Sequence, residues 1–108
     1  MQSEIQTLIK QGVIELNFYA STPQHAEERG ILSKKSLYIQ NLCVSESMRL
    51  KGIGKMVMTY IEDYATKNGY DIIFGYCDVD IVKNWLYRKG YAINDLTNEF
   101  HKVIKHDL

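Results

Sequence analysis

A long amphipathic helix between two apolar runs is the feature that most constrains the fold. Apolar and aromatic side chains in residues 53–68 recur at i, i+3, i+4, i+7, i+8 and i+11, which places them on one face of a helix of about four turns: Ile53, Met56, Val57, Tyr60, Ile61 and Tyr64. The flanking runs, residues 37–44 and 71–77, are typical of buried strands. Such a strand–helix–strand unit needs a crossover connection, so we expect parallel strands.

The rest of the chain supplies further elements of the same sheet. We expect a helix over residues 4–10 with Ser3 as its N-cap, a strand over 13–20 and a polar loop over 21–35. A second helix over 80–89, inward-facing at Trp85, precedes strands at 91–93 and 100–105. The pattern predicts one α/β domain spanning residues 1–108, with helices packed on the sheet.

Composition excludes several classes of protein. Thirteen basic residues balance thirteen acidic ones, so binding to nucleic acid through bulk charge is not expected. Cys43 and Cys77 lie in apolar runs and are interpreted as reduced core thiols, since no further cysteine completes a disulfide framework or a zinc site. No run is long enough for a signal peptide or a membrane span, which predicts a soluble, cytoplasmic protein.

The segment joining the first apolar strand to the long helix carries the chemistry. Arg49, Lys51 and Lys55 concentrate positive charge around Gly52 and Gly54, where a backbone without Cβ atoms approaches a ligand closely. The following helix adds N–H donors and the positive end of its dipole, so the loop suits a dianion such as pyrophosphate. Neither a Walker loop nor a Rossmann fingerprint is present. Taken alone, a solvated basic turn is an equally open reading.

Two motifs in this arrangement resemble the GNAT acetyltransferase superfamily. Arg49-x-x-Gly52-x-Gly54 matches its [QR]-x-x-G-x-[GA] signature, and residues 85–91 (WLYRKGY) are similar to a second conserved segment. The resemblance covers residues 37–93, about half the chain. It implies a mixed sheet whose central parallel strands splay apart.

The resemblance also implies acetyl-CoA as co-substrate and direct attack of a primary amine on its thioester. The pantetheine arm would lie along Leu42, Cys43 and Val44, with Asn84 within reach of it. The pyrophosphate would be held by the signature segment: Arg49, Leu50, Lys51, Gly52, Ile53, Gly54 and Lys55.

A tyrosine of the second motif would protonate the leaving thiolate, and Tyr87 is the candidate here. Alignment without a gap puts Leu86 in that position, and one residue turns a helical side chain by about 100°. A structural tyrosine at position 87 is therefore an equally open reading, and Tyr76 and Tyr91 are substitutes.

The family often places a carboxylate in the strand before the loop, where this chain has Gln40 and Asn41. Water or one of three side chains would then have to act as the base: Glu15, Asp78 or His101.

The alternatives to an active N-acetyltransferase are a CoA-binding protein that has lost catalysis and an unrelated α/β interaction module. Because few residues precede the strand at 37–44, the acceptor pocket looks abridged. Either a second subunit completes it, which predicts a homodimer, or the polar segment 21–35 holds the substrate loosely. Tyr19 and Tyr38 are interpreted as a cross-strand pair rather than as acceptor-site residues.

Overall fold

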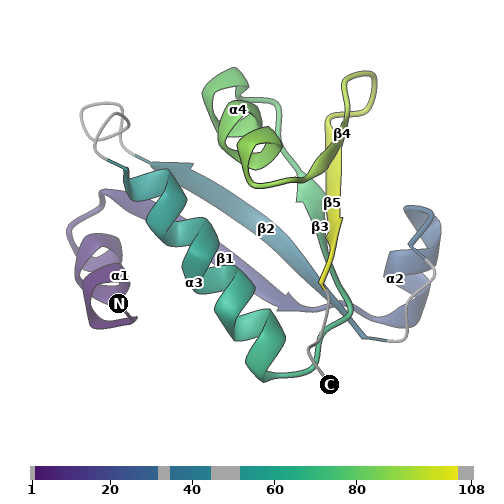
Figure 1. The fold of residues 1–108 in the computed structure, drawn as a ribbon, viewed down its shortest axis with the longest axis horizontal. Helices are drawn as coiled ribbons and strands as arrows, with labels where there is room; N and C mark the ends of the chain where they lie inside the picture. Colours follow the sequence, from purple (N-terminus) through teal and green to yellow (C-terminus); the bar gives the residue numbers. More distant parts are fainter. Residues whose placement is uncertain (1, 32–34, 45–51, 105–108) are drawn as a thin grey trace.

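The computed structural model describes residues 2–31, 35–44 and 52–104. Helices and strands alternate along most of the chain (Figure 1): α1 (Gln2–Lys10), β1 (Ile14–Ala20), α2 (Pro23–Glu28), β2 (Ser36–Val44), α3 (Ile53–Lys67), β3 (Ile72–Tyr76), α4 (Asp80–Arg88), β4 (Ala92–Asn94) and β5 (Glu99–Val103). The strand–helix–strand unit predicted from the amphipathic stripe is confirmed as β2, α3 and β3.

The strands form one mixed sheet in the order β1-β2-β3-β5-β4. β2 and β3 are parallel, as their helical crossover requires, and the other neighbouring pairs are antiparallel. The predicted α/β class with a central parallel pair is therefore confirmed.

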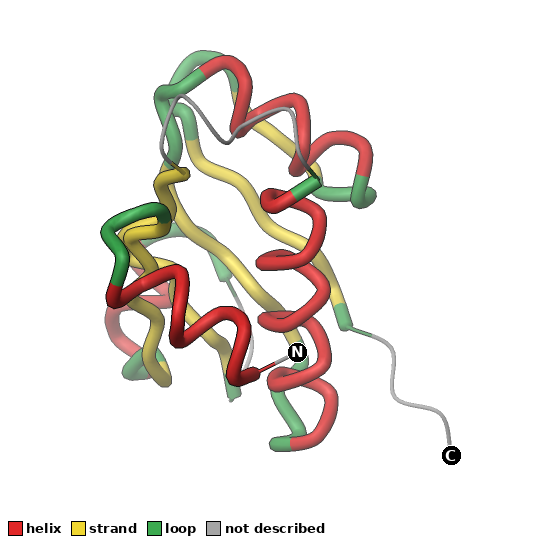
Figure 2. The backbone as a smooth tube through the Cα atoms, turned by 90° about the vertical axis from the view of Figure 1, so that its left-hand side faces the viewer, coloured by secondary structure: helices red, strands yellow, loops and turns green. Residues whose placement is uncertain are grey.

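The two faces of this sheet are covered unequally. α1, α3 and α4 pack on one face, where Val57, Met58 and Leu86 are fully buried. α2 alone packs on the other face, where its buried Ala26 contacts a small cluster with Phe74. Figure 2 shows α3 running alongside the strands. The α3 stripe is the core face, although Tyr64, at its end, is 37% exposed and not a buried core residue.

The central parallel strands diverge at a β-bulge. β2 pairs with β3 from Ser36↔Ile72 to Ile39↔Gly75, and then continues to Val44 against β1 alone. On the β1 side, Asn17 pairs with Asn41 and Phe18 with Ile39, which leaves Gln40 as an extra residue. A bulge bends its strand and increases the local twist. The predicted splay is confirmed (Figure 1), and it begins where the bulge sits.

Residues 21–35 were expected to form a loop, and for residues 23–28 that prediction is wrong. α2 begins with Pro23, whose fixed φ suits the first turn of a helix. The Thr22 Oγ1 atom accepts a hydrogen bond of 3.2 Å from the His25 backbone N–H and caps the helix. Because α2 has 6 residues and buries Ala26 alone, the sequence shows no helical periodicity there.

Two smaller predictions also need correction. Ser3 lies within α1 rather than capping it, because the helix already begins at Gln2. Cys77 is a buried core thiol as predicted, but Cys43 is exposed, and both are free. The bulge at Gln40 explains the second difference: after it, Leu42 faces the α3 side of the sheet, and Cys43 therefore faces the opposite side.

Candidate functional site

The start of α3 presents backbone donors beside the splayed strands. Gly52 precedes the helix with a φ of 75°, a left-handed conformation that favours glycine. The first hydrogen bond of the helix runs from the Met56 N–H to the Gly52 carbonyl oxygen, at 3.1 Å. The N–H groups of Ile53, Gly54 and Lys55 precede that bond in the first turn, where a helix provides no partner of its own. They can therefore serve an anion.

The side chains of this turn differ in their surroundings. Ile53 is buried in the core, so its backbone alone can meet a ligand, whereas Lys55 is exposed. Residues 45–51, which include Arg49, Leu50 and Lys51, lie outside the described residues. Their role in holding a pyrophosphate stays a prediction.

Gly54 has a structural role that the sequence did not indicate. A Cβ atom at this position would lie 2.4 Å from the Trp85 ring atoms Cδ2 and Cε3, so the missing side chain lets α4 pack on the start of α3. At Gly52 a Cβ atom would meet nothing within 4 Å. We expected both glycines to admit a ligand; Gly54 instead admits Trp85, which packs on α3.

The predicted binding segment of β2 lies in the part that diverges from β3. Leu42 is half-buried and Val44 is buried, both on the α3 side of the sheet, while Cys43 is exposed. An extended strand past the end of its parallel neighbour, together with the start of a helix, suits a ligand with an amide-bearing arm and an anionic end. These residues fit acetyl-CoA.

The residues predicted on α4 are exposed. Asn84 and Tyr87 lie three positions apart and share one helix face, and Tyr87 is 73% exposed. Leu86, one residue earlier, is fully buried. The rotation of about 100° between positions 86 and 87 thus separates a core residue from a solvent-facing tyrosine.

Of the two substitute tyrosines, Tyr91 belongs to a partly buried polar cluster. Its hydroxyl donates to Glu62 Oε2 at 3.3 Å, and the Glu62 carboxylate also pairs with Lys89 and Lys102 at 3.3 Å each. Burial raises the pKa of Tyr91, and the Glu62 charge raises it further, so the proton is held firmly. Tyr91 joins α3 to β5. Tyr76, by contrast, is 53% exposed at the end of β3, beside the divergence.

The Cys77 thiol is a poor nucleophile, and the described residues form no metal-binding cluster. Burial raises the pKa of the Cys77 thiol, whose Sγ donates to the Val79 carbonyl oxygen at 3.7 Å, so the thiol stays protonated at neutral pH. Within residues 2–31, 35–44 and 52–104, no group of three His, Cys, Asp or Glu side chains is placed to hold a metal ion. None of the described helices is long and apolar enough to cross a membrane.

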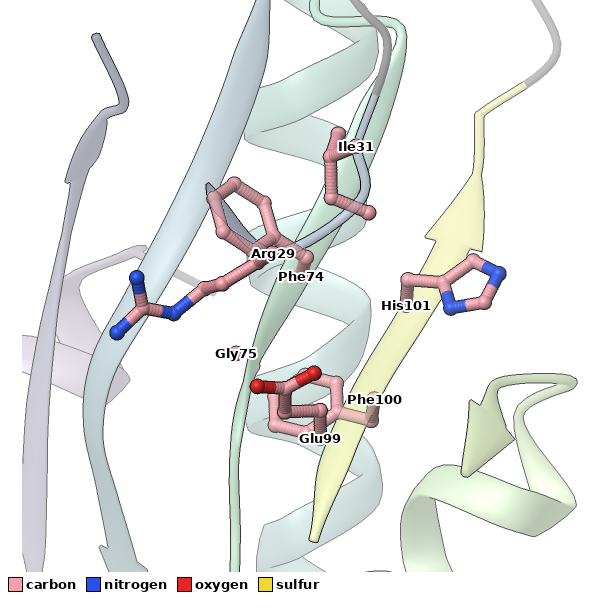
Figure 3. A pocket seen from close by; sticks show the side chains of 7 residues that line it. All are labelled: Arg29, Ile31, Phe74, Gly75, Glu99, Phe100 and His101. Atoms are coloured by element: carbon pink, nitrogen blue, oxygen red, sulfur yellow. The ribbon is translucent and has the colours of Figure 1, made fainter. Parts of the chain in front are cut away.

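A small pocket lies on the α2 side of the sheet (Figure 3). It is small and open to solvent. Its lining comes from the end of α2 and from β3 and β5: Arg29, Ile31, Phe74, Gly75, Glu99, Phe100 and His101. His101, one of the candidate bases, is exposed on β5, which lies between β3 and β4.

The aromatic side chains next to this pocket form a row across the sheet. Tyr19 and Tyr38 are directly opposite each other, with ring centroids 5.5 Å apart, which confirms the predicted cross-strand pair. Tyr38 in turn contacts His25 and Phe74.

Of the two other predicted bases, Glu15 lies on β1 opposite Cys43, and Asp78 follows β3; both are exposed.

Solved structures with the same fold include acetyltransferases with different partners. The AtaT–AtaR complex bound to DNA superposes with a TM-score of 0.63 at 10% identity, over 85% of this chain and 60% of that one. AtaTR bound to acetyl-CoA gives 0.62 at 10% identity, over 95% and 75%. A mosquito arylalkylamine N-acetyltransferase, like 5b, gives 0.53 at 17% identity, over 76% and 49%. The chain thus spans three fifths or less of the first and third of these proteins.

No curated protein matches the sequence. A model of the acetyltransferase (GNAT) family, however, matches residues 12–89, more than half of the chain. The matched range includes the splayed strands, the start of α3 and α4. That family uses acetyl-CoA, so the predicted co-substrate is confirmed at the level of the family. The chain therefore belongs to the GNAT family of acetyltransferases.

Proposed function

We propose that the chain transfers an acetyl group from acetyl-CoA to a primary amine. The observation that carries the proposal is the divergence of β2 from β3 after Ile39, in the strand that precedes α3. The start of the helix offers N–H donors to the pyrophosphate, and the free section of β2 offers an extended backbone to the pantetheine arm. Asn84 is proposed to reach the same arm from α4.

In the proposed reaction the neutral amine nitrogen attacks the thioester carbonyl carbon. The new C–N bond forms as the C–S bond breaks, and the departing thiolate takes up a proton while the amine nitrogen loses one. No covalent acetyl-enzyme is proposed, because the family resemblance implies direct attack by the amine; the buried, protonated Cys77 is also unsuited to act as a nucleophile.

Two tyrosines are candidates for the acid that protonates the thiolate. Tyr87 lies in the second motif of the family resemblance and is 73% exposed on α4. Tyr76 ends β3, one residue after the last β2–β3 pair. We retain Tyr87 as the proposed acid, with Tyr76 as the alternative.

The range of acceptors and partners to be tested is wider than the sequence indicates. AtaT has been solved with acetyl-methionyl-tRNAfMet, and the AtaT–AtaR complex with DNA. Amines carried by RNA therefore belong among the acceptors to be tested, and the expected absence of a nucleic-acid partner stays a prediction. A homodimer that completes the acceptor site is likewise proposed.

The test is release of free CoA thiol from acetyl-CoA in the presence of a panel of amines. We expect release that depends on the amine, and replacement of the true acid, by Tyr87→Phe or Tyr76→Phe, should lower kcat by about 10²–10⁴-fold. Tyr19→Phe, at another exposed tyrosine, is the control and should retain activity. Tight acetyl-CoA binding without release for any amine would instead support the non-catalytic CoA-binding protein.

A further inference from the structure

The pocket on the α2 side combines opposite charges with an apolar floor. Phe74, in the small cluster under α2, lies at the floor, and the Phe100 ring packs against Gly75 from the α3 side of the sheet. The Arg29 side chain enters from the end of α2, while Glu99 and His101 come from β5. In Figure 3 the Arg29 guanidinium is turned towards β2, away from the Glu99 carboxylate and the His101 ring. Cation and anion thus sit at different sides of one small cavity.

These two charges are not used elsewhere in the described structure. Among residues 2–31, 35–44 and 52–104, the ion pairs join Glu62 to lysines, and none involves Arg29 or Glu99. The Arg29 guanidinium lies 5.6 Å from the centre of the Tyr38 ring, a contact that leaves its N–H groups available. Both side chains are half-buried at the pocket, where a ligand would shield their charges from solvent.

The position of the pocket ties it to the splayed strands. Gly75 lines the pocket and is also the last residue of β3 that pairs with β2. α3 packs on one face of the sheet and the pocket opens on the other. An acyl arm that runs from the start of α3 through the gap between β2 and β3 therefore emerges beside the pocket. Glu99 is the closer charge to this gap along the strands, because it is paired with Tyr76, the residue after Gly75.

We propose that this pocket holds the acceptor, and that the acceptor is a small amine that also carries an anionic group. The Glu99 carboxylate binds the ammonium next to the gap, the Arg29 guanidinium binds the anionic group, and Phe74 at the floor contacts the carbons between them. The pocket is small and open to solvent, which favours a short acceptor that projects partly into solvent. This inference rests on the proposed acetyl transfer.

Two series of amines that differ only in a carboxylate distinguish the role of Arg29 from the role of Glu99. Glycine, β-alanine and γ-aminobutyrate are compared with methylamine, ethylamine and propylamine in the thiol-release assay. At the best chain length, the carboxylate should raise kcat/KM by about tenfold or more, as expected for a charge-assisted hydrogen bond. Arg29→Gln should remove this advantage through KM and leave the alkylamines unchanged. Glu99→Gln should lower kcat/KM for both series by about tenfold or more.

Controls keep the outcomes distinct. Glu27→Gln and Lys10→Gln remove exposed charges on α2 and α1 and should change neither series. Acetyl-CoA binding by every variant, measured by calorimetry, shows that the protein is folded and that the donor site is intact. Failure of the wild-type protein to bind acetyl-CoA would overturn the proposed function and this inference together. Amine-dependent release that is as fast in Arg29→Gln and Glu99→Gln as in the controls would overturn the pocket assignment alone. Acetylation confined to a protein or RNA amine and unaffected by Arg29→Gln would do the same.

Discussion

Gly75→Ala is expected to destabilise the protein by about 3 kcal/mol, at the upper end of the usual range for overpacking a core. A Cβ atom at this position would lie 2.6 Å from Phe100 Cζ and 2.9 Å from the Ile39 carbonyl oxygen. The phenylalanine ring can rotate away, but the carbonyl belongs to the last residue of β2 that pairs with β3. The clash with this carbonyl oxygen can therefore be relieved only if β2 and β3 separate before the pair Ile39↔Gly75.

Urea denaturation followed by circular dichroism measures this loss. Gly30→Ala is the matched control, because Gly30 is an exposed glycine at a φ of 74°, and a Cβ atom added there would meet nothing within 4 Å. It should cost about 1 kcal/mol from backbone strain. Phe100→Leu in the Gly75→Ala background should restore part of the stability at most, since the contact with Ile39 remains. Equal stability of Gly75→Ala and the wild-type protein would mean that β2 and β3 are not packed this closely.

Gly54→Ala is expected to lower the free energy of unfolding by about 1–3 kcal/mol, although alanine is the better helix former by about 1 kcal/mol. The reason is the Trp85 ring, whose nearest atoms lie 2.4 Å from the position of the new Cβ. α3 and α4 would have to move apart at the point where the proposed CoA site begins. A loss of acetyl-CoA affinity should accompany the loss of stability.

A double-mutant cycle with Trp85→Leu tests whether the indole is the cause. Leucine lacks the fused ring that meets the new Cβ, so the pair should be coupled by about 0.5–3 kcal/mol, as residues in contact commonly are. Gly52→Ala, with open space around it and a φ of 75°, should show strain that does not depend on Trp85. Additive effects of Gly54→Ala and Trp85→Leu would contradict the packing described here.

The periodic parts of the fold could be predicted from the sequence. The apolar stripe of α3 follows from side-chain spacing alone, and the crossover rule then makes β2 and β3 parallel. The position of the candidate phosphate loop follows from the two glycines and the basic residues between these elements. These inferences rest on local patterns, which a single sequence contains.

Features that depend on contacts between distant residues could not be predicted in the same way. In the sequence, the polar Gln40 and Asn41 within an apolar strand indicate only a missing carboxylate, whereas the structure places a bulge at Gln40. α2 is too short to show a helical periodicity in the sequence, so the position of Arg29 at its end could not be predicted. Glu99 is a candidate ligand-binding residue only because β5 pairs with β3, which places it beside Tyr76.

Calorimetric titration of the protein with acetyl-CoA tests the central claim most directly, with S-acetylpantetheine, which lacks the phosphates, as the comparison. If the start of α3 holds the pyrophosphate, acetyl-CoA should bind with micromolar affinity and S-acetylpantetheine at least about a hundredfold more weakly, as expected from the loss of charge-assisted hydrogen bonds. The absence of binding at millimolar acetyl-CoA by the folded protein would contradict the account, and equal affinity for both compounds would contradict the role given to α3.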